Sequence, residues 1–274
     1  MASDLKNRID EAASFIRSKS DVSPSIGIIL GTGLGQLAKH LQAASTIAYS
    51  DIPNFPVSTV EYHAGELMVG TLAGKPVVTM CGRVHYYEGY TMQEVTFPVR
   101  VMKALGAHVL IVSSAVGAMN PDFDLGDLVI VRDHINLMGD NPLMGPNDAE
   151  LGPRFPDMSR PYDNELIRLA EDAARREKVT THRGILVAVA GPNLETAAEY
   201  RFLRSVGADV VGMSVVPENL VAVHGSMRVL GLSVVTDKCI PETLEPADIE
   251  RILRVAQEAE PRLARIVMDV VSHI

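Results

Sequence analysis

Short apolar runs recur along the chain, separated by longer segments in which apolar and polar residues are mixed. The runs are rich in Val and Ile, and several are apolar at consecutive positions, which is typical of strands buried on both faces. We therefore predict strands at Ile26–Leu30, Pro76–Met80, Val109–Ser113, Leu128–Val131, Gly184–Ala190, Val210–Gly212 and Val229–Val235.

The segments between these runs have the apolar spacing of amphipathic helices, and so does the N-terminal stretch MASDLKNRIDEAASFIR. Strands that alternate with helices indicate an α/β fold, which we expect as one domain over residues 1–274. Its central twisted sheet should be mostly parallel or mixed and flanked by helices. The helices are predicted at Met92–Leu105, Asn164–Lys178, Thr196–Val206, Pro217–His224 and from Pro246 onward.

The stretch Leu137–Pro161 is too rich in Pro, Gly and Asn for a regular element, and connections of this length are usually functional or oligomeric.

Composition and charge narrow the possible partners. Hydrophobic residues make up 47% of the chain and charged residues 22%, as in an ordinary globular protein with a sizeable core. The net charge of −9, without a basic block, argues against a nucleic-acid partner. No apolar run approaches the roughly 20 residues of a membrane span, and the N-terminus lacks a secretory signal. Cys81 and Cys239 provide neither a disulfide framework nor a thiolate zinc cluster, which favours a reducing cytoplasm.

The segment SIGIILGTGLGQL, residues 25–37, reads as a strand, a glycine turn and a helix start. A dinucleotide fingerprint would need a glycine where Gln36 stands, and the third glycine comes early, at Gly35. The Lys-Ser or Lys-Thr pair of a Walker-type phosphate loop is missing as well. Free backbone N–H groups and the Thr32 hydroxyl would suit phosphate or another small anion. A purely structural glycine turn is the alternative.

The segment CGRVHYYEGY directly follows a predicted strand. Arg83, His85 and Tyr87 alternate there, so in an extended chain all three side chains project to one side. A guanidinium, an imidazole and a phenol that converge at a strand end would form a cradle for an oxyanion. The alternative is a solvated loop in which Arg83 pairs with Glu88. The tyrosines and glycines of the segment disfavour that alternative.

At these residues the chain resembles the trimeric-type purine nucleoside phosphorylases, and the resemblance runs through nearly the whole sequence. It implies a single α/β domain, a cytoplasmic homotrimer and a role in purine salvage. It also implies reversible, phosphate-dependent cleavage of a purine (deoxy)ribonucleoside to free base and pentose 1-phosphate, with phosphate as co-substrate and no metal or cofactor. The matching motifs are LGTGLG, HAG, GRVHYYEGY, SSAVGAMN, NPLMGPND, GPRFPDMS, AGPNLET, GADVVGMSVVPE and SVVTDK.

The resemblance also assigns roles to residues, with His85, Glu195 and Asp237 as the catalytic groups. Phosphate would be held by Thr32, Arg83, His85, the Ala115 backbone and Ser214. The ribose would lie against Tyr87, Met213 and, from the neighbouring subunit, Phe155. The purine would lie among Leu194, Glu195, Thr236, Asp237, Val116 and Gly117. Taken singly, each of several residues has a structural alternative: core filling for Met213, a strand-end cap for Ser214, a loop anchor for Phe155 and a helix-dipole role for Glu195.

Several positions depart from the 6-oxopurine branch of this family. Asp237 stands where that branch has Asn, and a carboxylate cannot donate to a 6-oxo group unless it is protonated. Ile249 falls near the position of a histidine that binds the 5′-hydroxyl, Ser114 replaces an Asn, and Leu194 replaces an aromatic residue. A general purine nucleoside phosphorylase is favoured, with an adenosine- or methylthioadenosine-preferring phosphorylase as the alternative.

Two more distant hypotheses are an NAD-dependent oxidoreductase built on the glycine turn and a binding protein that kept the fold without the activity. The glycine spacing disfavours the oxidoreductase, and the joint presence of Arg83, His85, Glu195 and Asp237 disfavours the binding protein.

Overall fold

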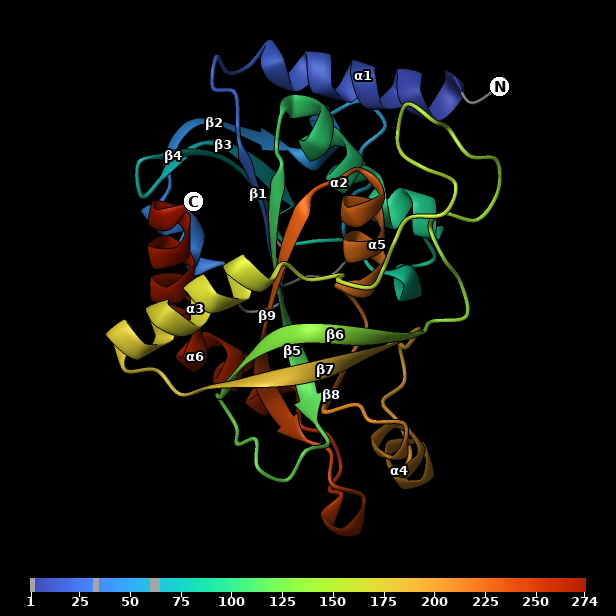
Figure 1. The fold of residues 1–274 in the computed structure, drawn as a ribbon, viewed down its shortest axis with the longest axis vertical. Coiled ribbons are helices and arrows are strands. Elements are labelled where there is room, and N and C mark those ends of the chain that lie inside the picture. The colour runs from blue at the N-terminus through green and yellow to red at the C-terminus, as the bar shows by residue number, and fades with distance from the viewer. Residues whose placement is uncertain (1–2, 32–34, 60–64) are drawn as a thin grey trace.

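The computed structural model describes residues 3–31, 35–59 and 65–274. Their strands form a single mixed sheet of nine strands in the order β2-β3-β4-β1-β5-β8-β7-β6-β9 (Figure 1). The strands are β1 Ile26–Leu30, β2 Gln42–Ala48, β3 Glu66–Leu72, β4 Lys75–Cys81, β5 Val109–Ala118, β6 Leu128–Leu137, β7 Thr181–Val189, β8 Val210–Gly212 and β9 Arg228–Lys238.

The second half of the sheet curls until its ends meet. β5 pairs with both β8 and β9, and β7 and β6 complete the circuit between those two strands. In Figure 1, β6 and β7 accordingly run across the direction of β5 and β9. The sheet combines parallel pairs, such as β1 with β4 and β5, and antiparallel pairs, such as β3 with β4. The predicted α/β fold with a mixed sheet is thus confirmed.

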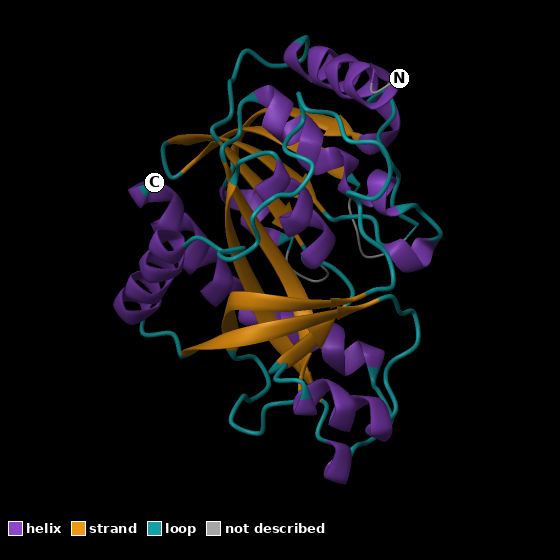
Figure 2. Cartoon of the chain, turned by 45° about the vertical axis from the view of Figure 1, so that its right-hand side comes forward, coloured by secondary structure: helices purple, strands orange, loops and turns teal. Residues whose placement is uncertain are grey.

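Helices cover the outside of the sheet (Figure 2). α1 packs on α2, α2 on α5, and α3 on α6. Each of these helices turns small or branched apolar side chains inward, as the amphipathic spacing predicts. The helices are α1 Ser3–Arg17, α2 Met92–Leu105, α3 Asn164–Glu177, α4 Ala197–Ser205, α5 Val216–His224 and α6 Ile249–His273.

Two strands escape prediction from the apolar pattern. β2 lies at the edge of the sheet and pairs only with β3, and most of its residues are exposed or half-buried, so it carries no apolar run. β3 has Glu66 and Gly70 within it, which interrupt the alternation. Of the stretch Leu137–Pro161 that was predicted to be irregular, Leu137 is the last residue of β6, and the remainder forms neither helix nor strand, as predicted.

Candidate active site

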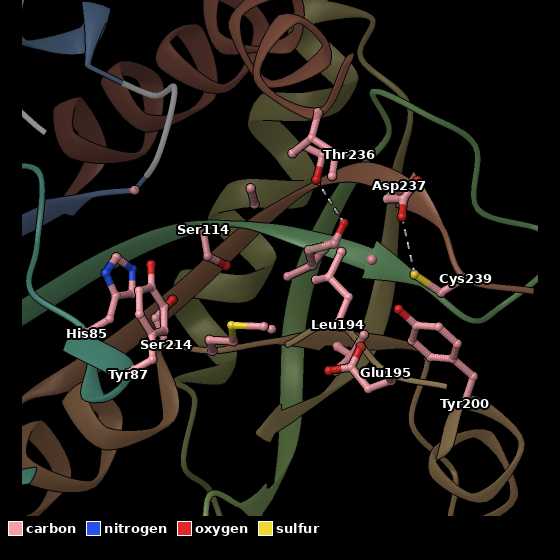
Figure 3. A pocket seen from close by; sticks show the side chains of 18 of the residues that line it. His85, Tyr87, Ser114, Leu194, Glu195, Tyr200, Ser214, Thr236, Asp237 and Cys239 are labelled. Atoms are coloured by element: carbon pink, nitrogen blue, oxygen red, sulfur yellow. Dashed lines mark hydrogen bonds between the residues drawn. The ribbon is translucent and has the colours of Figure 1, made fainter. Parts of the chain in front are cut away.

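One cavity of about 180 Å³, open to solvent, lies where the ends of several strands meet. Its side chains form two groups in Figure 3: His85, Tyr87 and Ser214 at one end, and residues around Glu195 and Asp237 at the other. The cavity gathers residues from distant parts of the sequence. Of those that the sequence singles out, it is lined by Arg83, His85, Tyr87, Ala115, Val116, Gly117, Leu194, Glu195, Met213, Ser214, Thr236 and Asp237.

The lining also includes residues that were not predicted from the sequence. Cys239 lies two positions after Asp237 and directly follows the end of β9, and continued alternation of the extended chain could have placed both on one side. Tyr200 comes from α4, and its place in the cavity depends on how that helix packs. The remaining additions are Gly31, Val211, Gly212 and Ile252, together with Ser114, which the sequence marked only as a departure from the family.

Gly31 directly follows β1, at a point where the chain comes unusually close to β5. A Cβ atom on Gly31 would lie 2.7 Å from the carbonyl oxygen of Ser113, which is closer than a side chain can approach. The Gly31 N–H donates to the Ser113 Oγ at 3.3 Å. Gly31 therefore contributes bare backbone to the same cavity as Arg83 and His85. Thr32, the predicted phosphate ligand that follows it, lies outside the described residues.

The expected helix after the glycine turn is a short 3₁₀ segment, Gln36–His40. The N–H groups of Gln36 and Leu37 donate to the carboxylate of Glu260 on α6, at 3.2 Å for Leu37. Burial raises the pKa of Glu260, and these two hydrogen bonds oppose the rise. The sequence predicted a bound anion at this helix start, but a carboxylate of the chain itself already takes these N–H groups.

Arg83 is held from two sides. It follows Gly82, which has a φ of 96°, just after β4 ends. Its Nη1 donates to Glu218 Oε1 at 2.9 Å, and its Nη2 donates to the carbonyl oxygen of Ser113. Burial lowers the pKa of the guanidinium, whose side chain is only 2% exposed. The alternative pairing with Glu88 does not form, because Arg83 pairs with Glu218 from α5 instead.

Glu88 orients His85. One carboxylate oxygen accepts from the His85 backbone N–H at 2.7 Å and contacts the ring Nδ1 at 3.0 Å. The other oxygen accepts from the N–H and hydroxyl of Thr59, both at 2.7 Å. Burial raises the pKa of Glu88, but these hydrogen bonds outweigh it and hold the pKa below its usual range. An ionised Glu88 favours a proton on Nδ1 and thereby fixes the orientation of the ring.

Tyr87 stacks on His85 with ring centroids 4.7 Å apart and an interplanar angle of 12°. Burial raises the pKa of the phenol to about 12, so it remains a neutral hydrogen-bonding group. The segment is not extended as the alternation argument assumed, because residues Tyr86–Glu88 form a 3₁₀ turn. Arg83, His85 and Tyr87 nevertheless line one cavity.

A strained turn places Ser214. The next residue, Val215, has φ 75° and ψ −50°, and the Val216 N–H donates to the Ser214 carbonyl oxygen at 2.9 Å. These features define a γ-turn with a positive φ, a conformation that is rare for a β-branched residue. Backbone strain of this kind is concentrated at functional sites. It argues against a simple strand-end cap as the role of Ser214.

Glu195 does not cap its helix. α4 begins after Thr196, whose hydroxyl pairs with Glu199 in a capping box, so Glu199 carries the helix-terminal role. Hydrogen bonds from Thr196 lower the pKa of Glu199, whereas burial raises the pKa of Glu195. The Tyr200 hydroxyl hydrogen-bonds the Glu195 carboxylate and partly offsets that rise. The capping box leaves Glu195 out of the helix-terminal hydrogen bonds, and its carboxylate faces the cavity, which disfavours the helix-dipole alternative.

Asp237 lies on β9, and its side chain lies at the same end of the cavity as Glu195. Its Oδ1 accepts from Arg251 Nη2 at 3.2 Å, and the Cys239 thiol approaches Oδ2 at 3.9 Å. The neighbouring Thr236 donates its hydroxyl to the carbonyl oxygen of Val116 at 3.3 Å. One face of the cavity therefore presents two carboxylates, Glu195 and Asp237, to any flat ring bound there.

Two predicted residues lie elsewhere. Phe155 is 86% exposed, in the long irregular connection, and is not part of the cavity lining. Ile249 is 54% exposed at the start of α6, and Ile252, one turn later, lines the cavity instead. Positions three apart share a helix face, so Ile252 takes the place expected for Ile249 one turn farther along α6.

No helix within the described ranges is long and apolar enough to span a bilayer. Within the same ranges, no three His, Cys, Asp or Glu side chains gather closely enough to hold a metal ion.

Comparison with known proteins places this cavity in a family. The model of the phosphorylase superfamily matches residues 25–272. Purine nucleoside phosphorylase 1 of Bacillus subtilis is 50% identical over 268 residues, which is 98% of this chain and 99% of that protein. A structure of isoform 2 of Schistosoma mansoni purine nucleoside phosphorylase, bound to cytosine and ribose-1-phosphate, superposes with a TM-score of 0.94.

The sequence of that structure is 38% identical to this chain, and the superposition covers 98% of this chain and 96% of the Schistosoma mansoni chain. A second Schistosoma mansoni structure, bound to adenosine, gives a TM-score of 0.93 at 38% identity and covers 98% and 97% of the two chains. Fold, cavity and sequence agree. The chain belongs to the phosphorylase superfamily and, within it, to the purine nucleoside phosphorylases, a family of pentosyltransferases.

Proposed function

We propose that the enzyme catalyses reversible phosphorolysis of purine nucleosides, with free purine base and pentose 1-phosphate as products. The observation that carries this proposal is the single cavity with a cationic end at Arg83 and His85 and a carboxylate end at Glu195 and Asp237. An anion and a flat heterocycle fit side by side in such a cavity. Relatives in complex with ribose-1-phosphate and with adenosine support the same assignment.

The cationic end is suited to inorganic phosphate as a co-substrate. Arg83 supplies a fixed charge, and His85, Ser214 and the backbone at Ala115 supply polar groups around it. Fixed donors in a partly enclosed site stabilise a divalent anion without reorganisation. Thr32 would add a hydroxyl. We include in the proposal that the reaction needs no metal and no organic cofactor.

The sugar lies between the two ends in this proposal, against Tyr87 and Met213. As the glycosidic bond breaks, the sugar carbon gains positive charge, which phosphate stabilises from one face before it adds to that carbon. The departing purine gains negative charge on its ring nitrogens. Glu195 accepts hydrogen bonds from the six-membered ring, and Asp237 accepts from the exocyclic group or, when protonated, delivers a proton to the ring.

The test is release of base from inosine and from adenosine, with and without phosphate, by enzyme dialysed against a chelator. We expect release only when phosphate is present, with pentose 1-phosphate formed in equal amount. Release at the same rate without phosphate would identify a hydrolase and overturn the proposal. A requirement for added NAD or metal would overturn it as well.

We also propose that the enzyme is a cytoplasmic homotrimer that serves purine salvage. Both cysteines are free and buried, which suits a reducing compartment. Phe155 supports the trimer, because an aromatic side chain that is 86% exposed gains from burial against a neighbour. Sedimentation should give three times the chain mass, and Phe155→Ala should raise the nucleoside KM with little change in the phosphate KM. A monomer with full activity would contradict this part.

Two features of the cavity support a second candidate function, that of an adenosine- or methylthioadenosine-preferring phosphorylase. The carboxylate of Asp237 is paired with Arg251, and the apolar Ile252 lines the cavity. Relative kcat/KM values for adenosine, methylthioadenosine and inosine separate this candidate from a general purine nucleoside phosphorylase.

A further inference from the structure

Arg251 does not line the cavity, but it places a positive charge beside the carboxylate end. It lies in the first turn of α6, where its backbone N–H donates to the cap residue Asp248 at 3.0 Å. Its Nη2 reaches Asp237 Oδ1 at 3.2 Å, with the two side chains 32% and 14% exposed. Within the described residues, Asp237 is its one carboxylate partner.

Among the ion pairs of the described residues, Arg251 is the cation that pairs with Asp237. The Cys239 thiol faces Oδ2, and burial raises its pKa to about 12, so it stays neutral. Tyr200 hydrogen-bonds both Cys239 and Glu195, and burial raises the pKa of its phenol well above its ordinary value. The Lys238 ammonium points away, to Asp124 at 2.9 Å. Glu195 adds a second acidic group.

The hydrogen bonds that the Asp237 carboxylate can make decide which substituent of a purine base fits beside it. A charged carboxylate only accepts hydrogen bonds, so it complements a 6-amino group, which donates. The same carboxylate opposes a 6-oxo group, because two acceptors would face each other across a desolvated contact. The hydrogen bond from Arg251 Nη2 to Oδ1 at 3.2 Å holds the Asp237 carboxylate in one orientation and leaves its second oxygen to face a bound base.

We propose that Arg251 is a positioning and specificity-determining residue, which holds Asp237 as an oriented acceptor and so directs the enzyme toward 6-aminopurine nucleosides. This inference rests on the proposed function, because it concerns the choice among nucleosides. Arg251 acts through Asp237 and does not itself line the cavity.

The experiment is a double-mutant cycle read as a substrate ratio. The ratio of kcat/KM for adenosine to kcat/KM for inosine is measured for wild type, Arg251→Met, Asp237→Asn and the double variant. Wild type should prefer adenosine. Arg251→Met should lower the ratio by about tenfold, equivalent to roughly 1.4 kcal/mol, and Arg251→Lys should keep most of it. In the Asp237→Asn background, Arg251→Met should change the ratio less than about twofold.

Arg254→Met is the matched control, because it removes the same charge from an exposed position one turn along α6. It should leave the ratio unchanged. A purely structural role for Arg251 would lower both kcat/KM values together and leave the ratio constant, which overturns the inference. An equal effect of Arg251→Met with and without Asp237 overturns it too, as does a wild type that prefers inosine. Absence of phosphate-dependent cleavage of either nucleoside would instead overturn the proposed function.

Discussion

Removal of Glu218 tests the buried charge pair on which the cationic end of the cavity depends. Arg83 and Glu218 are 2% and 3% exposed, and their Nη1 and Oε1 atoms are 2.9 Å apart. In Glu218→Ala, Arg83 loses this carboxylate and keeps its hydrogen bond to the Ser113 carbonyl oxygen. Breaking a buried pair by deleting one partner costs about 3–5 kcal/mol of unfolding free energy, because the buried charge that remains loses its counter-charge.

A loss of that size should lower Tm by about 6–20 °C, at roughly 2–4 °C per kcal/mol for a domain of this class. Urea denaturation and thermal melts of the purified enzyme measure the loss. Glu242→Ala is the control, because Glu242 is 62% exposed and pairs with Arg201 only at 3.7 Å. Its unfolding free energy should change by less than about 0.5 kcal/mol.

Phosphate provides a second measurement on the same variant. If Arg83 binds phosphate, saturating phosphate should raise the Tm of Glu218→Ala more than that of wild type, because the anion then supplies the missing negative charge. A Glu218→Ala enzyme as stable as Glu242→Ala would refute the reasoning about the buried pair. Equal phosphate-induced shifts in Glu218→Ala and wild type would separate Arg83 from the anion.

Three further predictions concern single groups. Arg83→Ala should raise the phosphate KM far more than the nucleoside KM in steady-state kinetics; the reverse pattern would remove Arg83 from the anion site. Because burial raises the pKa of Glu195, nucleoside kcat/KM should fall as pH drops through a value above 4.5. The Tyr200 hydroxyl lowers the pKa of Glu195, so Tyr200→Phe should raise that pKa and shift this acidic fall in kcat/KM to higher pH. An unshifted pH profile would contradict the contact between Tyr200 and Glu195. The pKa of Glu260 in the folded state lies above 4.5, so the folded state binds more protons than the unfolded state at and above that pH. The free energy of unfolding should therefore decrease as pH rises from 4.5. Urea melts across this range should show that slope in wild type and a weaker one in Glu260→Gln; equal slopes would exclude Glu260.

The apolar pattern predicted most of the strands and helices because buried elements need continuous or periodic apolar faces. It missed β2, since an exposed edge strand needs no such face. It also could not predict that β5 to β9 close on themselves, because closure depends on pairings between strands far apart in the sequence.

For the cavity, the sequence by itself determined which chemical groups are available. Arg83, His85, Glu195 and Asp237 stand in motifs that match those of the family in the same order along the chain. Only the tertiary structure decided their partners. Glu218 and Arg251 come from helices remote in sequence, and Glu260 takes the N–H groups expected to meet an anion. The physical reason is that a motif specifies side chains within a few residues, whereas burial and ion pairing are fixed by whichever element packs across them.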